Sequence, residues 1–209
     1  MSPDLFWIAG PWRGRLAIAT RPRGGDWLND EVSGWRRAGI DVVVSLLESK
    51  EADQLGLLEE SKVAEAEGLR FISFPIPDRG VPASVPAAIS LMADVASSLD
   101  EGKNVAVHCR QGVGRSGLVA AGVLVNSGVS PEDAIKAVRS ARGFDVPETA
   151  DQRLWVEQLP YRLRRADTLR LLSTSFTSAE NACSSNSASS SWWRFNEPDA
   201  GLALGARPA

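Results

Sequence analysis

The chain has 209 residues, 44% of them hydrophobic and 23% charged, which is enough for one globular domain with a substantial core. Its formal net charge of −3 gives no overall attraction to nucleic acid or to anionic lipid, so an anion would have to bind in a local pocket. We therefore expect a monomer that binds a small phosphorylated ligand or peptide, with no nucleic-acid and no membrane partner.

The two cysteines, Cys109 and Cys183, are too few for a disulfide framework and indicate intracellular thiols. Asp4 lies where a signal peptide would carry positive charge. The longest apolar run, residues 117–125, has about half of the roughly 20 residues that a membrane helix needs. These features predict a soluble, cytoplasmic protein.

The predicted elements alternate between strands and helices. Residues 6–9 and 16–19 are expected to form an antiparallel pair at a sheet edge, and buried strands are predicted at 41–47, 69–75 and 104–108. Helical spacing occurs in residues 51–67, 86–99 and 118–126, and Ser130 begins a further helix that ends at 142–143. This order predicts an α/β fold, with a mostly parallel central sheet flanked by helices.

The composition changes near residue 173, after which Ser, Thr, Asn and Ala dominate as far as Ser191. Such a segment buries too little apolar surface to offset its ordering entropy. We predict one domain over residues 1–168 and a flexible tail over residues 169–209. Trp192, Trp193 and Phe195 are interpreted as incidental aromatics, with docking onto the body or a partner as the alternative. Cys183 is expected to be a free thiol, with a regulatory disulfide to Cys109 as the alternative.

The most informative segment is 108–116, His-Cys-Arg-Gln-Gly-Val-Gly-Arg-Ser, which runs from a predicted strand directly into a predicted helix. Ligands of α/β sheets bind beyond the carboxyl ends of strands, and a helix N-terminus presents unpaired amides to an anion. Five residues between Cys109 and Arg115 suffice to wrap one phosphate, and Gly112 and Gly114 permit the sharp turns. The same field favours a thiolate, so we expect the pKa of Cys109 to lie well below about 8.5.

The side chains of this segment suggest distinct roles. Arg115 can donate two parallel hydrogen bonds to phosphate oxygens, a geometry that lysine cannot copy. Ser116 can donate to the sulfur of Cys109 and help it to leave. His108, the only histidine, is interpreted as a structural hydrogen-bonding residue behind the loop rather than a base. The expected phosphate-binding residues are Arg110, Gln111, Gly112, Val113, Gly114 and Arg115.

His108-Cys109-x5-Arg115-Ser116 resembles the signature loop of the protein tyrosine phosphatase superfamily, and the short chain resembles its dual-specificity branch. Residues 74–82, Phe-Pro-Ile-Pro-Asp-Arg-Gly-Val-Pro, resemble the acid loop of that family, which implies that Asp78 is the general acid. Asp145 is the nearest competitor for that role. Residues 142–152 are similar to the segment in which some of these enzymes carry a water-positioning glutamine, here Gln152.

The resemblance implies a metal-free and cofactor-free phosphatase that hydrolyses phosphate monoesters through a cysteinyl phosphate. Its expected substrates carry phosphotyrosine, with phosphoserine or phosphothreonine as further possibilities. A non-protein phosphate such as a phosphoinositide is an alternative, although the loop offers Arg110 and no lysine. For Arg79 and Arg110, solvated surface charge is as good an interpretation as substrate contact. The rival functions are a non-catalytic phosphate-binding module and a thiol enzyme of sulfur transfer or arsenate reduction.

Overall fold

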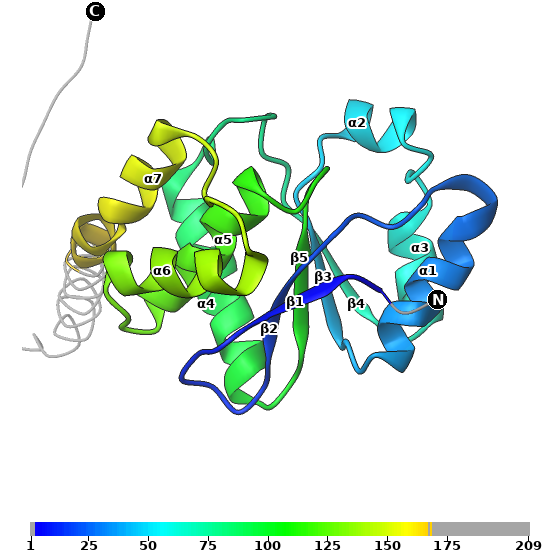
Figure 1. Ribbon diagram of the computed structural model, residues 1–209, viewed down its shortest axis with the longest axis horizontal. Coiled ribbons are helices and arrows are strands. Elements are labelled where there is room, and N and C mark those ends of the chain that lie inside the picture. Colours follow the sequence, from blue (N-terminus) through cyan, green and yellow to red (C-terminus); the bar gives the residue numbers. More distant parts are fainter. Residues whose placement is uncertain (1–2, 167, 169–209) are drawn as a thin grey trace, which may run out of the picture. The chain divides into compact units, whose positions relative to one another are not determined.

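The computed structural model describes residues 3–166 and residue 168, and its centre is a five-stranded sheet with helices on both faces (Figure 1). The strand order is β1 (Leu5–Ile8), β2 (Leu16–Ala19), β5 (Val105–His108), β3 (Val42–Ser45) and β4 (Arg70–Ser73). β1 is antiparallel to β2, and the other three pairings are parallel. The predicted α/β class with a mostly parallel sheet is confirmed.

The three predicted strands are present, and β5 lies in the middle of the sheet between β2 and β3. β3 and β5 are buried as expected, but β4 is partly exposed, because it lies at the edge and pairs on one side only. The antiparallel pair predicted at a sheet edge is also present, with β1 as the outer strand. β2 joins this pair to β5, and all four of its residues are buried.

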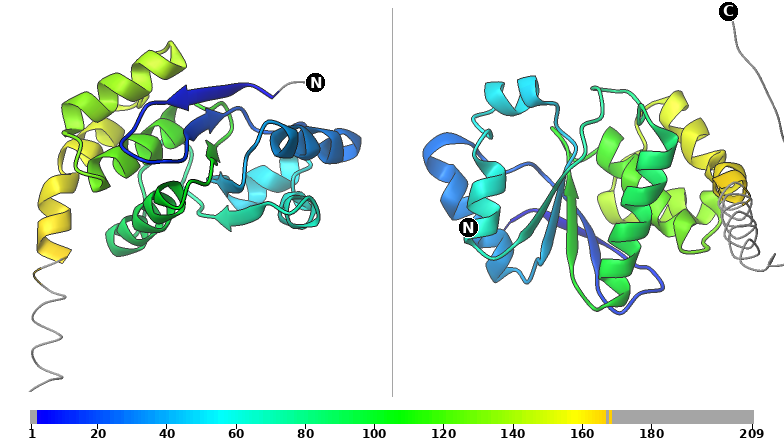
Figure 2. Two further views of the ribbon diagram at one scale, coloured as in Figure 1. Left: turned by 90° about the horizontal axis from the view of Figure 1, so that it is seen from below. Right: turned by 180° about the vertical axis from the view of Figure 1, so that it is seen from behind.

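The helices form a layer on each face of the sheet (Figure 2). α1 (Leu28–Arg37) and α3 (Glu60–Ala66) cover one face, after a short 3-10 turn, η1 (Gly25–Trp27). α4 (Val85–Asp100), α5 (Gly114–Asn126), α6 (Pro131–Arg142) and α7 (Ala150–Glu157) lie on the other face. α2 (Ser49–Gln54) follows β3 beyond the carboxyl end of the sheet.

The ends of the helices follow local chemistry. Ser130 accepts a hydrogen bond from the Asp133 amide at the start of α6, and Gly143 ends that helix with φ +74°. The segment of predicted helical spacing, residues 51–67, contains two separate helices, α2 and α3, instead of being helical throughout. The chain turns between them at Gly56, where φ is +67° and a Cβ would lie 3.1 Å from the Gly25 nitrogen. Only glycine fits both conditions without strain.

The core has one part on each face of the sheet, and α5 is buried along almost its whole length. Small residues allow this helix to pack closely against the sheet and its neighbouring helices. As β5 is central and α5 follows it directly, residues 109–113 lie at the middle of the carboxyl edge of the sheet. None of the helices in the described part of the chain is long and apolar enough to cross a lipid bilayer.

The predicted tail, residues 169–209, lies outside the described residues, together with Cys183, Trp192, Trp193 and Phe195. The boundary at residue 168 therefore stays a prediction.

Candidate active site

A cavity of about 200 Å³ opens where the 109–113 loop passes from β5 into α5. Gly112 makes the loop's sharp turn with φ +65°, and a Cβ there would lie 2.9 Å from the Ala19 carbonyl oxygen. α5 begins without a side-chain cap, which leaves its first amides available to an anion. The residues that line the cavity are Asp78, Arg79, Cys109, Arg110, Gln111, Val113, Gly114, Arg115 and Glu148.

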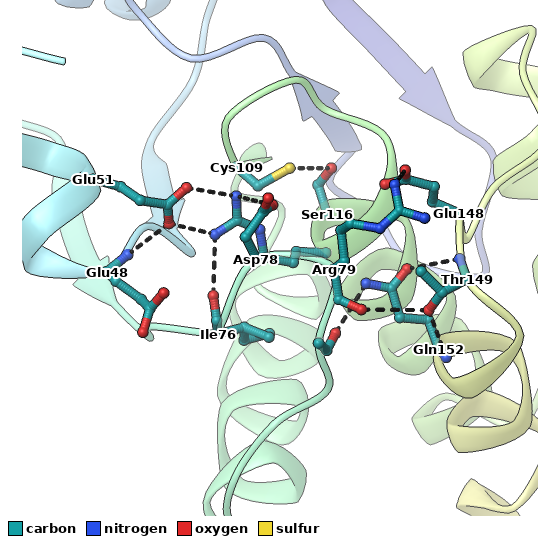
Figure 3. A network of polar contacts seen from close by, with 12 residues as sticks. Glu48, Glu51, Ile76, Asp78, Arg79, Cys109, Ser116, Glu148, Thr149 and Gln152 are labelled. Carbon is teal, nitrogen blue, oxygen red and sulfur yellow. Dashed lines mark hydrogen bonds and ion pairs between the residues drawn. The ribbon is translucent and has the colours of Figure 1, made fainter. Parts of the chain in front are cut away.

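Cys109 forms the floor of this loop and is only 3% exposed. Burial raises the pKa of its thiol, but hydrogen bonds from the Ser116 hydroxyl and from the amides of Ser116, Gln111 and Val113 outweigh burial and lower it overall. The Sγ atom lies 3.5 Å from Ser116 Oγ, which is itself buried beneath the cavity rather than lining it (Figure 3). The lowered pKa favours the thiolate, in agreement with the expectation from sequence.

Arg115 is held in place by Glu51 of α2, a residue that the sequence did not single out. Nη1 and Nη2 each donate to one carboxylate oxygen of Glu51, at 2.6 and 3.0 Å, and Nη1 also donates to the Ile76 carbonyl at 3.0 Å. Hydrogen bonding from Arg115 lowers the pKa of Glu51 despite its burial. A charged carboxylate therefore fixes the guanidinium plane.

These contacts take three of the five N–H donors of Arg115. The two that remain, on Nε and Nη2, are parallel and form the side-on edge of the guanidinium, which suits two oxygens of one phosphate. Asp78 lies near this edge, with Oδ1 3.1 Å from Nη2 and a side chain that is 64% exposed. The carboxyl of Asp78 thus lies where it can reach a group bound to Arg115.

The loop that carries Asp78 is tied to the start of α7 (Figure 3). Arg79 Nη1 pairs with Glu148 Oε1 at 2.5 Å, and the Thr149 hydroxyl donates to the Arg79 carbonyl at 3.5 Å. Gln152 Nε2 donates to the Gly80 carbonyl at 2.9 Å, while its Oε1 accepts from the Thr149 amide. Gln152 is fully buried, so here its side chain holds the acid loop, and its predicted role in placing water stays a prediction.

Arg142, at the end of α6, supports the phosphate loop from outside. Its Nε donates to the Gly112 carbonyl at 2.7 Å and its Nη2 to the Gln111 carbonyl at 3.1 Å. The guanidinium carbon also lies 4.1 Å from the Phe6 ring centroid, over the ring. By binding these two carbonyls, Arg142 favours a loop conformation in which the amides point toward the cavity.

Arg142→Met is expected to weaken binding of orthovanadate, a phosphate analogue, by about tenfold, because methionine keeps the apolar stem but donates no hydrogen bond. The dissociation constant is measured by calorimetry on the whole chain. Arg139→Met is the matched control, since Arg139 lies on the same helix and pairs with Asp145 instead of the loop. Equal weakening in both variants would contradict the role given to Arg142.

Asp145 and His108, for which the sequence indicated an alternative and a structural role, lie outside the cavity. Asp145 does not line the cavity, and its carboxylate is bound by Arg139 and Arg153, with the hydrogen bond from Arg153 lowering its pKa. It is therefore poorly placed to compete with Asp78 as an acid. His108 is buried behind the loop as expected, but neither ring nitrogen makes a hydrogen bond within the described residues. Its Nε2 lies 3.0 Å from Glu60 Oε1.

The predicted residues divide into two groups. Cys109, Arg110, Gln111, Val113, Gly114, Arg115 and Asp78 line one cavity, whereas Gly112, Ser116 and Gln152 support it from behind. Three further residues position the site and were not predicted from the sequence: Glu51, Glu148 and Arg142. In the described residues, no group of three or more His, Cys, Asp or Glu side chains is placed to hold a metal ion.

Comparison with known proteins agrees with this geometry. Residues 18–129, more than half of the chain, match the sequence model of the family described as "Polymorphic toxin system, DSP-PTPase phosphatase". The chain belongs to this phosphatase family. The resemblance to dual-specificity phosphatases seen in the sequence is thereby confirmed. Cyclin-dependent kinase inhibitor 3 of Rattus norvegicus is 36% identical over 80 residues, which cover 37% of this chain and 37% of the rat protein.

Solved structures extend the similarity over more of the chain. The structure of Tk-PTP in the active form is 31% identical with a TM-score of 0.64, over 78% of this chain and 99% of that chain. Kinase associated phosphatase, with its catalytic-site cysteine substituted by serine, has a TM-score of 0.73 at 20% identity. That similarity covers 78% of this chain and 97% of the other, and it shows a shared fold.

Proposed function

We propose that this protein hydrolyses phosphate monoesters in two steps, with Cys109 as the nucleophile and without a metal ion. The observation that carries the proposal is a single cavity that combines a thiol whose pKa is lowered, the start of α5, the side-on edge of Arg115 and the carboxyl of Asp78. Each of these groups suits one requirement of phosphoryl transfer: a nucleophile, an anion cradle, a charge clamp and a proton donor.

In the first step the thiolate of Cys109 attacks phosphorus, and the bond from phosphorus to the ester oxygen breaks. Asp78 gives its proton to that oxygen, so the alcohol or phenol leaves neutral. The loop amides and the Nε–Nη2 edge of Arg115 bind the three equatorial oxygens of the phosphoryl group and stabilise the charge that they carry in the transition state. Glu51 keeps that edge fixed.

In the second step a water oxygen attacks the cysteinyl phosphate, and the carboxylate of Asp78 accepts the proton of this water. The sulfur–phosphorus bond breaks, which releases inorganic phosphate and regenerates the thiolate. The Ser116 hydroxyl, 3.5 Å from Sγ, stabilises the departing thiolate by a hydrogen bond. The side chain of Gln152 holds the acid loop through its hydrogen bond to the Gly80 carbonyl. It would have to release this carbonyl before it could bind the attacking water.

Hydrolysis of 4-nitrophenyl phosphate with EDTA present tests the proposal. We expect turnover that EDTA leaves unchanged, that vanadate inhibits, and that passes through a phosphoenzyme with one phosphate on Cys109. A folded, reduced protein that binds vanadate without turnover would instead favour the non-catalytic binding module. Persulfide transfer from thiosulfate without phosphatase activity would favour the sulfur-transfer enzyme.

Asp78→Asn is expected to lower kcat/KM by about 10²-fold, because asparagine has no proton to donate to the leaving oxygen. The loss is expected to be larger for phenyl phosphate than for 4-nitrophenyl phosphate, since a more basic leaving oxygen depends more on protonation. Initial rates with both esters provide the measurement. Asp145→Asn is the control and keeps near-normal rates for both; an equal loss with both esters in Asp78→Asn would argue against a general acid.

Ser116→Ala is expected to raise the pKa of Cys109, because the hydrogen bond from this hydroxyl favours the anion and its removal makes the thiol harder to ionise. The rate of iodoacetamide alkylation measured against pH reports the pKa directly. The inflection should move to higher pH in Ser116→Ala and stay in place in Ser140→Ala, whose serine is exposed on α6. An inflection that moves to lower pH would contradict this assignment.

We further propose phosphorylated proteins or peptides as substrates, with phosphotyrosine first. Support comes from the charge at the rim of the cavity. Arg79 is paired with Glu148, so Arg110 supplies most of the positive charge there. A rim with so little positive charge disfavours a headgroup that carries several phosphates. A panel of phosphotyrosine, phosphothreonine and phosphoinositide substrates separates these classes. A thiolate nucleophile needs a reducing compartment, which supports a cytoplasmic location.

A further inference from the structure

A second cavity lies on another part of the carboxyl edge of the sheet and shares no lining residue with the Cys109 cavity. Its volume is about 330 Å³, within the range of cavities that bind small molecules. Its walls come from the ends of β3 and β4, from α2 and α3, and from the turn between these helices. It is thus built from five segments of the chain that fold together.

Glu60 of α3 dominates the electrostatics of this cavity. Among the described residues, it is the only charged side chain in the cavity wall, yet it is just 2% exposed. Its Oε1 atom is buried and lies 3.0 Å from Nε2 of the buried His108, without a hydrogen bond of good geometry in the described part of the chain. A carboxylate in such a wall, with no cation of the described residues beside it in the lining, favours a ligand that carries positive charge.

The remaining walls define the rest of the ligand. Ser45, Ser49, Ser61 and Ser73 line the cavity, and serine hydroxyl groups can accept hydrogen bonds from an ammonium group. Leucine and phenylalanine side chains, including Phe71, supply apolar surface for a short carbon chain. No lysine or arginine of the described residues contributes to the wall, so an anionic ligand would find no partner there.

We propose that this cavity binds a small organic cation, a primary ammonium group on a short aliphatic chain, with Glu60 as its counter-ion. The site has two direct connections to the candidate active site. Glu60 contacts His108, which precedes Cys109, and Ser49 begins α2, the helix that carries the Glu51 partner of Arg115. The proposal concerns binding and does not depend on phosphatase activity.

Backbone amide NMR on the whole ¹⁵N-labelled chain tests the site, with n-butylammonium chloride as the probe. n-Butanol and sodium butyrate are the matched neutral and anionic probes, at the same concentration and ionic strength. We expect saturable shifts of the Ser45, Ser49, Ser61 and Ser73 amides with butylammonium, at least tenfold weaker binding of butanol, and no saturable shift with butyrate. Equal responses to butylammonium and butanol would refute the role of charge.

Three variants locate the response. Glu60→Gln should weaken butylammonium binding at least tenfold, and Glu59→Gln, which changes the exposed neighbouring carboxyl outside the cavity, should leave it unchanged. Ser73→Leu fills the cavity from the exposed edge strand without altering Glu60, so it covers the case in which Glu60→Gln fails to fold. Unchanged affinity in Ser73→Leu would overturn the site, as would unchanged affinity in a folded Glu60→Gln variant.

Discussion

Cys109→Ser is expected to lower the turnover of 4-nitrophenyl phosphate by at least about 10⁴-fold, the scale on which loss of a nucleophile reduces catalysis in other covalent enzymes. The serine hydroxyl keeps its proton at neutral pH, whereas the amides and the Ser116 hydroxyl around residue 109 favour a thiolate. Initial rates of the wild type and the variant, at equal folded concentration, give the ratio.

The same variant should still bind phosphate at least as tightly as the wild type. The loop amides and Arg115 are unchanged, and the negative charge of the thiolate no longer opposes the dianion. Calorimetric titration with inorganic phosphate supplies this control. Substantial residual turnover in Cys109→Ser would mean that another group attacks phosphorus, and loss of phosphate binding would mean that the loop had not formed.

Arg115→Lys is expected to lower kcat/KM by about 10³-fold, even though the charge at this position is kept. Arg115 binds Glu51 with one edge of its guanidinium and leaves a second, parallel edge for phosphate. A lysine ammonium is a single point of donation, so it cannot pair with both Glu51 oxygens and also present two aligned donors to a phosphate. Steady-state kinetics with 4-nitrophenyl phosphate measure the loss.

Arg110→Lys is the matched control, because Arg110 belongs to the same loop but is exposed at the rim. Its loss should stay below about tenfold, in line with the small contribution of exposed charges. Thermal unfolding of both variants separates a catalytic defect from a folding defect. Similar losses in the two variants would show that general positive charge, rather than the two-edged geometry of Arg115, matters at this site.

The parts of the site that the sequence could predict are contiguous in the chain. The strand, the loop and the helix around Cys109 follow one another directly, so the residue pattern alone fixes what the loop presents to an anion. Gly112 is a clear example, because its φ of +65° and its close approach to Ala19 both require glycine. Asp78 was implied by resemblance and does lie beside Arg115.

The supporting contacts could not be predicted, because they join distant segments. Glu51 is 64 residues from Arg115, and Arg79 is 69 residues from Glu148. The residues around a glutamate on a short helix look the same in the sequence whether its side chain is exposed to solvent or buried against an arginine. Gln152 was difficult for the same reason: a glutamine on a helix is usually exposed, and here the packing of α7 against the acid loop buries it.

Three helical features were missed. α7 was not predicted as an element, although Thr149 and Gln152 form a capping box at its start. α1 was not predicted, although Leu28, Val32 and Trp35 recur at helical spacing and are buried; Gly34 within it lowers helix propensity. The segment 51–67 has enough Leu, Glu and Ala to suggest a continuous helix, and Gly56 was insufficient evidence of a break. Its positive φ becomes necessary only because the chain passes close to Gly25.

The two hydrogen bonds from Arg115 to Glu51 also reduce the entropy that is lost when phosphate binds. An arginine side chain has about 2 kcal/mol of rotamer entropy to lose when it becomes fixed. In this protein that ordering takes place when the chain folds, since two carboxylate oxygens and the Ile76 carbonyl already immobilise the guanidinium. A phosphate that reaches the remaining edge meets a rigid receptor, so little of its interaction energy is needed to arrange the side chain that receives it.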